Sequence, residues 1–208
     1  MPLRATWLVI DGVLVVHVAT GLWWYGEGRG GLVANLVFDR APGFRVAVGG
    51  QHQRWIDTGQ YWRWLTSVWL HTGLGHLLVN VSGLWVLGRL LEPWIGAARW
   101  LALFVAGGVA GSVASPLVGV TQSDGASGGG FALIGAIWVF GWRLADRLDA
   151  EDQRLLGPIW SAVLIGNLIL GLVLPFVDAA AHAGGLLFGV AAGAVLALPT
   201  QSSDGASS

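Results

Sequence analysis

The chain has 208 residues, of which 54% are hydrophobic and only 11% are charged, and its mean hydropathy is +0.65. Because an average soluble domain carries roughly 25% charged residues, this composition predicts an all-α membrane protein with several spans. The formal net charge of −1 gives no reason to expect a nucleic acid as partner, and the lack of cysteine excludes disulfides, thiolate metal sites and thiol catalysis.

The first apolar run covers residues 7–24 and is long enough to cross about 30 Å of hydrocarbon. It contains Asp11, which we expect at the membrane interface, and His17, which we expect in a contact between helices. Residues 25–60 form a long connection in which repeated glycines break any continuous span. Because apolar and aromatic side chains remain scattered through this connection, we expect a long interfacial first loop.

The second span is predicted at residues 61–91 and carries polar side chains at a helical spacing. His76 and Asn80 are four residues apart and so share one face of a helix, whereas His71 would lie about 140° away around the helix. Polar groups are costly in hydrocarbon unless they are satisfied. The face of His76 and Asn80 therefore meets either other helices or a water-filled cavity, and both interpretations are open at this point.

A short charged turn should follow, and then the third and fourth spans, predicted at residues 100–120 and 127–144. The residues expected in the charged turn are Arg89, Glu92, Pro93 and Arg99. The fourth span starts at Ser127, where backbone N–H groups lack partners within the helix. A hydroxyl there is placed to attack a substrate with oxyanion donors nearby. The alternative is a small packing residue or a helix cap.

The most charged stretch, residues 143–154, predicts a solvated turn before the fifth span at residues 157–176. We expect Asn167 of the fifth span to serve in packing between helices. The sixth span is predicted at residues 179–198, and a soluble tail at residues 200–208.

The fourth and sixth spans each combine one reactive group with a face of small or aromatic residues. The face on the sixth span, at i, i+3 and i+7, consists of His182, Gly185 and Gly189. The face on the fourth span, at i, i+4 and i+8, consists of Ser127, Phe131 and Gly135. Two such faces can pack closely enough to bring Ser127 and His182 within hydrogen-bond reach.

The alternation of six spans predicts the sidedness of these groups. With a cytoplasmic N-terminus, Ser127 and the start of the sixth span fall on the same outer side of the membrane. Six arginines then fall inside, with Arg4 counted, against five in or next to the long first loop outside, and the other two outer turns contain none, so the positive-inside rule favours this orientation by one arginine.

Four groups of residues form a pattern that reaches beyond the single spans: Trp62-Arg63, His71 with His76-x-x-x-Asn80, Gly125-x-Ser127-Gly128, and Ala181-His182-x-x-Gly185-x-x-x-Gly189. This pattern resembles the rhomboid family of intramembrane serine proteases. The resemblance implies a single six-transmembrane-helix rhomboid-like domain over residues 1–199, with residues 25–60 as its interfacial loop.

By the same resemblance, Ser127 is the nucleophile and His182 the general base. His76 and Asn80 are similar to the oxyanion-hole side chains of the family, joined by the Ser127 backbone N–H. Phe131 occupies the place where the family often has an aromatic residue against the catalytic histidine. The supporting or packing residues that the resemblance implies are Gly125, Gly128, Gly135, Gly185, Gly189, His71, Trp62, Arg63 and Glu92.

We therefore predict an intramembrane serine endopeptidase that cleaves transmembrane segments near the outer face through an acyl-enzyme. Asp178 lies one turn before His182 and is a possible third member, but we expect a Ser-His dyad. The reaction needs neither a metal ion nor a cofactor. The expected partners are single-span or polytopic membrane-protein substrates and the lipid bilayer, and the expected location is the bacterial inner membrane.

Other functions fit the residues less well. None of the five histidines is followed by glutamate, so the His-Glu-x-x-His arrangement of many zinc proteases is missing, and no Gly-Asp pair supports an aspartyl protease. A catalytically inactive rhomboid-like protein that binds membrane clients is the main alternative, although such proteins usually lack the serine or the histidine. A transporter would use polar residues along its pathway, but the two halves of the chain show no repeat. The candidate pathway residues are Asp11, His17 and Asn167.

Overall fold

The computed structural model describes residues 2–38, 40–143, 146, 150–154, 159, 161–162, 165–166, 169 and 177–196. Most of the predicted fifth span, including Asn167, and the predicted tail lie outside these residues. The elements in chain order are α1 (Arg4–Gly26), α2 (Leu32–Val37), α3 (Pro42–Ala47), β1 (Gln51–His52), α4 (Gln53–Ile56), α5 (Arg63–Thr66), the 3-10 helix η1 (Ser67–Trp69), α6 (Leu74–Ile95), α7 (Ala97–Leu117), β2 (Gln122–Ser123), α8 (Ser127–Arg143), α9 (Ala150–Arg154) and α11 (Ala179–Leu196).

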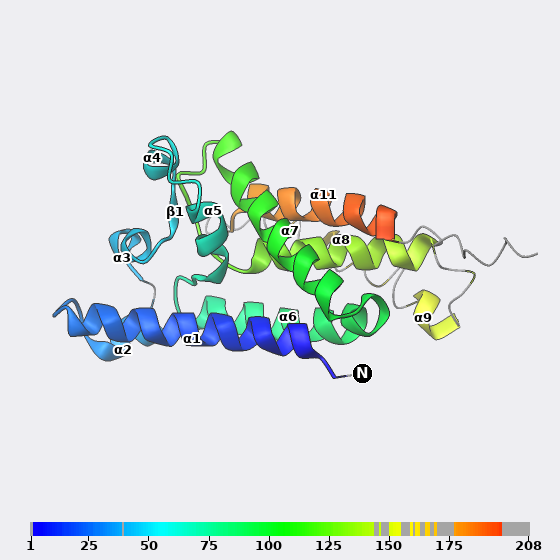
Figure 1. Ribbon diagram of the computed structural model, residues 1–208, viewed down its shortest axis with the longest axis horizontal. Coiled ribbons are helices and arrows are strands. Elements are labelled where there is room, and N and C mark those ends of the chain that lie inside the picture. Colours follow the sequence, from blue (N-terminus) through cyan, green and yellow to red (C-terminus); the bar gives the residue numbers. More distant parts are fainter. Residues whose placement is uncertain are drawn as a thin grey trace, which may run out of the picture.

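Four of the described helices, α1, α6, α7 and α11, are long and apolar enough to cross a membrane. Helix α1 packs along α6, while α7, α8 and α11 pack on one another (Figure 1). The starts of α6, α8 and α11 point toward the end of the molecule that carries α3, α4 and β1, and the N-terminus lies at the opposite end (Figure 1). Helices α1, α7, α8 and α11 agree with the predicted first, third, fourth and sixth spans within a few residues.

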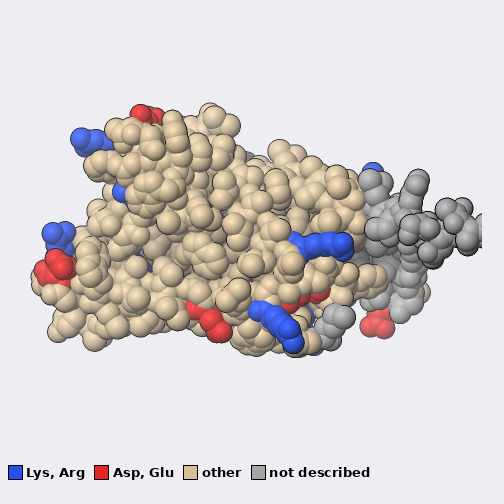
Figure 2. Space-filling model, in the orientation of Figure 1, with Lys and Arg blue, Asp and Glu red and all other residues tan. Residues whose placement is uncertain are grey.

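The surface of the bundle has the polarity that a bilayer requires. On the face shown in Figure 2, most charged side chains lie toward the two ends, and the surface between them is largely uncharged. In helix α1, for example, about half or more of the surface of several large apolar residues is exposed. These residues are Trp7, Leu8, Val15, Leu22 and Trp23. Lipid, rather than water, is the solvent for such a surface.

The prediction of one helix over residues 61–91 is wrong. Helix α6 begins only after Gly73, and the backbone is extended at Leu70 and Gly73. The reason is that the residues before α6 are bound to other segments. Arg63 donates to two carbonyl groups of the first loop, and the Ser67 carbonyl accepts from the turn before α8. Residues 63–69 therefore form only the short helices α5 and η1, and the chain turns through residues 70–73 before α6 begins.

The prediction of a charged turn between the second and third spans is also wrong, because Glu92 lies inside α6 and is buried. Its carboxylate accepts hydrogen bonds from the backbone N–H groups of Ala5 and Thr6, at 2.9 Å each, and from the Thr6 hydroxyl. The first N–H groups of a helix have no partner within it, so Glu92 caps α1 from a neighbouring helix. The other residues expected in that turn are likewise helical: Arg89, Pro93 and Arg99.

The first loop is folded and is attached to the rest of the chain at both of its ends. Near its start, Arg40 is buried and donates to the carbonyl groups of His17 and Asn35 and to the Thr20 hydroxyl. His17 Nε2 lies 2.9 Å from the Leu36 carbonyl, so this histidine makes its contact with α2. Near its end, β1 pairs antiparallel with β2, the strand just before α8.

Replacing Glu92 by glutamine should destabilise the protein by about 2 kcal/mol, because the neutral amide keeps one acceptor oxygen where the carboxylate has two and carries no charge. Thermal unfolding in detergent measures the effect. Glu27→Gln is the matched control, because Glu27 is exposed at the other end of α1. Equal unfolding temperatures for the two variants would contradict the cap.

Candidate active site

A cavity of about 1010 Å³ opens between the starts of α6, α8 and α11 and the loop before α8. Most of the residues that the sequence singled out for chemistry line it, among apolar side chains of α6 and α8. The polar lining residues on these helices include His76, Asn80, Ser127, Asp178 and His182. The cavity therefore brings a small set of polar groups together inside an apolar bundle, as binding and catalytic sites commonly do.

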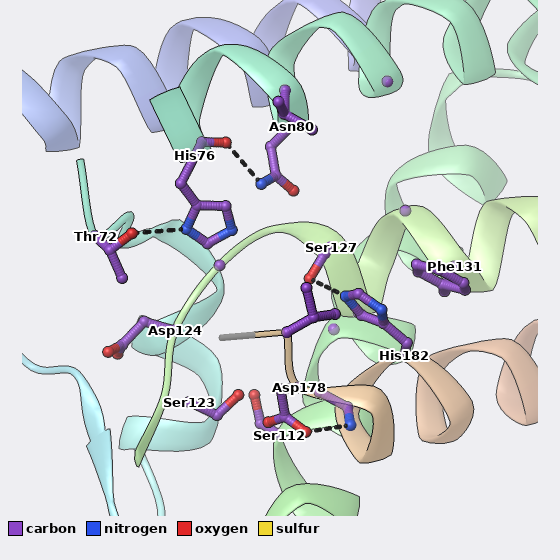
Figure 3. A pocket seen from close by; sticks show the side chains of 18 of the residues that line it. Thr72, His76, Asn80, Ser112, Ser123, Asp124, Ser127, Phe131, Asp178 and His182 are labelled. Atoms are coloured by element: carbon purple, nitrogen blue, oxygen red, sulfur yellow. Dashed lines mark hydrogen bonds between the residues drawn. The ribbon is translucent and has the colours of Figure 1, made fainter. Parts of the chain in front are cut away.

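Ser127 and His182 meet at one wall of this cavity (Figure 3). Although 55 residues separate them in sequence, Ser127 Oγ lies 2.9 Å from His182 Nε2. The Phe131 ring stacks on the imidazole, with centroids 4.1 Å apart and planes 15° apart. In the described part of the chain, His182 Nδ1 has no hydrogen-bond partner. An imidazole with its hydrogen on Nδ1 can accept the serine proton at Nε2.

Asp178 does not orient this imidazole. Its carboxylate accepts a hydrogen bond from the Ser115 hydroxyl and another, at 2.9 Å, from the backbone N–H of Ala181 (Figure 3). Asp178 thus caps the start of α11 and ties it to α7. Among the described residues, no carboxylate is hydrogen-bonded to the His182 ring.

The turn before α8 presents the serine at the first position of a helix. Gly125 has a φ of +140°, and its N–H donates to the Ser67 carbonyl at 3.0 Å. A Cβ atom at Gly125 would lie 2.8 Å from His76 Cε1, so a side chain there is excluded by both backbone and space. The N–H groups of the first turn of α8, beginning at Ser127, are oriented toward the cavity end of the helix and can bind a developing negative charge.

His76 and Asn80 reach this cavity from α6. The Asn80 amide extends from α6 toward the space above Ser127 (Figure 3), and its Nδ2 donates to the His76 carbonyl at 2.9 Å. His76 Nδ1 lies 3.3 Å from the Thr72 hydroxyl, which leaves the Nε2 side of the ring next to the Gly125 turn. Both side chains thus line the same cavity as Ser127.

The prediction that His71 faces away from His76 is wrong. His71 precedes α6 in the extended stretch, is completely buried, and packs its ring edge-on against that of His76 with centroids 5.1 Å apart. The angle of about 140° expected between His71 and His76 assumed one continuous helix. It does not apply, because α6 begins only after Gly73. Trp62 is half exposed, while Arg63 lies buried under it and holds the first loop.

Glycines set the distance between the two helices that carry Ser127 and His182. A Cβ atom at Gly185 would overlap the carbonyl of Gly128, and one at Gly189 would overlap the carbonyl of Ala132. On the other helix, a Cβ atom at Gly135 would lie 2.6 Å from the Leu186 carbonyl oxygen. Backbone therefore contacts backbone along α8 and α11, as small residues permit in membrane helices.

A cluster of charged and polar groups, where the first loop meets the turn before α8, was not anticipated from the sequence. Asp124 forms an ion pair with Arg45, 79 residues away, at 2.9 Å, and accepts from the Gln51 backbone N–H at 3.1 Å. Burial raises the pKa of Asp124 to about 7, against the opposing effect of Arg45. A carboxylate directly before a Gly-x-Ser-Gly turn was the one visible signal, and nothing in the sequence identified its partner.

Comparisons with known proteins agree with these features. A family model described as Rhomboid domain matches residues 58–199. Rhomboid protease GluP of Bacillus subtilis (strain 168) is 36% identical over 154 residues, which cover 74% of this chain and 30% of that protein. RHOMBOID-like protein 5 of Arabidopsis thaliana is 35% identical over 160 residues, covering 74% and 50%. Rhomboid protease GlpG of Yersinia pestis (strain Pestoides F) is 31% identical over 132 residues, covering 63% and 46%.

Apolar helices of spanning length, together with the match to this family model, define an integral membrane protein. The chain belongs to the rhomboid family. It spans 30 to 50% of the length of the relatives named above.

Replacing Gly185 by alanine should push α11 away from α8, because the new methyl group meets the Gly128 carbonyl. We expect a loss of about 2 kcal/mol in stability and at least a tenfold slower reaction of Ser127 with a fluorophosphonate. Thermal unfolding and the labelling rate measure the two effects. Gly43→Ala in α3 is the control, since nothing lies within 4 Å of its Cβ position. Unchanged labelling in Gly185→Ala would refute the role of this contact.

Proposed function

We propose that this protein is an intramembrane serine endopeptidase with Ser127 as nucleophile and His182 as general base. Its substrates are single-span or polytopic membrane proteins, cut in their transmembrane segments near the outer face. The observation that carries the proposal is the 2.9 Å approach of Ser127 Oγ to His182 Nε2 in a cavity large enough for an extended piece of chain. The names of the relatives that are proteases support it.

In the first half of the reaction, Ser127 Oγ attacks the scissile carbonyl carbon while its proton passes to His182 Nε2. The carbonyl oxygen becomes an oxyanion, stabilised by His76, Asn80 and the Ser127 backbone N–H. The intermediate then collapses as the C–N bond breaks, and His182 returns the proton to the leaving amine. The product is an acyl ester on Ser127.

In the second half, water attacks the ester carbonyl and gives its proton to His182. A second oxyanion forms in the same place and collapses as the bond from carbon to Ser127 Oγ breaks. His182 then returns the proton to the serine, and the second product leaves as a carboxylic acid. Phe131, stacked on the imidazole, holds the ring plane through both halves.

For the membrane topology we propose six spans, with the fifth in residues 157–176, a cytoplasmic N-terminus and the cavity toward the outer side. The N-terminus and the starts of α6, α8 and α11 lie at opposite ends of the molecule, in support of this orientation (Figure 1). The proposed location is the bacterial inner membrane.

Ser127→Ala and His182→Ala should each lower cleavage of a single-span substrate in liposomes by at least about 10³-fold, because each removes one partner of the proton transfer. Product formation and thermal unfolding are measured together, and both variants should unfold near the wild-type temperature. Cleavage that persists in either variant would overturn the assignment. Folded wild-type protein that neither cleaves nor reacts with a fluorophosphonate would favour a client-binding protein.

Asn80→Ala should lower kcat by about 10- to 100-fold and leave KM within about twofold, because the oxyanion exists only in the transition state. The measurement is steady-state cleavage of the same substrate. Leu78→Ala is the control, since Leu78 is a neighbour on α6 with an exposed side chain that has no polar group and does not line the cavity. A change in KM alone would assign Asn80 to substrate binding instead.

A further inference from the structure

The carboxylate of Asp124, three residues before Ser127, holds the serine-bearing turn against the first loop. Its side chain is completely buried. One oxygen accepts from Arg45 Nη1 at 2.9 Å and from Gln122 Nε2 at 3.4 Å, and the other accepts from the Gln51 backbone N–H at 3.1 Å. Figure 3 shows the carboxylate directed away from Ser127, so it does not take part in bond making.

Backbone groups of the first loop, as well as the charged side chain of Arg45, surround this carboxylate. A Cβ atom at Gly50 would lie 2.5 Å from Asp124 Oδ1, so glycine is needed for the close approach. Gln51 pairs with Ser123 in the two-residue ladder of β1 and β2, and the Gln53 N–H donates to the Thr121 carbonyl at 2.8 Å. The segment before Ser127 is thus clasped by the loop on the outer side of the bundle.

The same turn is held on its inner side by different contacts. The Gly125 N–H donates to the Ser67 carbonyl, Ala126 is completely buried, and the Gly125 backbone lies against the His76 ring. Two anchors, at Asp124 and at Gly125, therefore determine where the N–H of Ser127 points relative to His76. Loss of the Asp124 side-chain contacts leaves the turn held at Gly125 and, further from Ser127, by the ladder of β1 and β2.

We propose that Asp124 is a positioning residue whose ion pair with Arg45 holds the Ser127 turn in its reactive geometry and so makes the reaction depend on the state of the first loop. This inference rests on the proposed function, because it assigns to Asp124 the positioning of the same serine, Ser127. When Asp124 takes up a proton, the ion pair is lost and the outer anchor weakens.

The burial of Asp124 places this protonation near neutral pH, since its pKa is raised from 3.8 to about 7. Between these values the folded protein holds a proton that the unfolded chain has released, so the stability contributed by Asp124 is present below about pH 4 and lost as the pH rises through 7. Acid thus weakens the anchor without destabilising the fold through this group. The charged and titratable groups around the cluster are Arg40, Arg45, His52, Arg63, His76, Asp178 and His182.

The test compares wild type with Asp124→Asn, which keeps the shape of a protonated aspartic acid and cannot ionise. The rate constant for labelling of Ser127 by a fluorophosphonate is measured from pH 5 to 8.5 on full-length protein in liposomes, with thermal unfolding at each pH. At pH 8 we expect labelling of Asp124→Asn to be about tenfold slower than wild type. The two rates should converge below pH 6, because both side chains are then neutral. Asp124→Glu should recover part of the rate.

Two further variants sharpen the result. Arg45→Gln removes the ion pair at every pH, so its labelling at pH 8 should be slower than that of wild type, and the inflection that remains should move to higher pH because the cation no longer favours the carboxylate. Asp57→Asn is the matched control, because its carboxylate is exposed in the same loop and accepts a hydrogen bond from the Gln53 side chain, and it should follow the wild-type profile. The unfolding temperature of wild type should not fall between pH 7 and 6 when the labelling rate does.

Equal rates of wild type and Asp124→Asn at pH 8, or the same inflection near pH 7 in both, would overturn this inference and leave the proposed function intact. If Asp124→Asn proves unfolded, an unmoved inflection in folded Arg45→Gln overturns it in the same way. Folded wild-type protein that is labelled at no pH would instead contradict the proposed function itself, and this inference with it.

Discussion

The structure depends first on the contact of backbone with backbone between α8 and α11. Lipid chains are as apolar as the helices, so burial of apolar surface does little to hold these two helices together. Instead, the close approach of the two backbones holds the helices together. Gly185 lies against the Gly128 carbonyl and Gly189 against the Ala132 carbonyl, where no side chain fits. The same contact determines the distance between Ser127, one residue before Gly128, and His182, three residues before Gly185. A single set of contacts therefore determines both the packing of α8 on α11 and the distance between Ser127 and His182.

The polar groups of the site lie where helices begin, and this has a physical reason. A helix start offers unpaired N–H groups even in a membrane, and three starts in the described bundle, those of α1, α8 and α11, meet either a polar partner or the cavity. Glu92 takes the first N–H groups of α1, Asp178 takes one of α11, and the start of α8 is left facing the cavity. The two capped starts strengthen contacts between helices, while the third is free to bind a developing charge.

The positions of four helices were predictable because a long apolar run with helical spacing is a local property of the sequence. Spans of apolar residues and the faces of Ser127 and His182 follow from spacing alone, and α1, α7, α8 and α11 agree with them. The second span was misplaced because local hydrophobicity continues through residues 61–73, whereas contacts of the Arg63 side chain and the Ser67 carbonyl with distant segments hold the short helices α5 and η1 apart from α6. The predicted orientation of His71 failed with it.

The sequence by itself determined a helical membrane protein, the two reactive groups and the small residues beside them, since composition and period are local properties. Tertiary structure decided which polar residues meet. Glu92 reaches the start of α1 across 86 positions, and Asp124 reaches Arg45 across 79. No spacing rule links such residues, because their proximity arises only when the helices and the first loop have packed and closed the intervening chain.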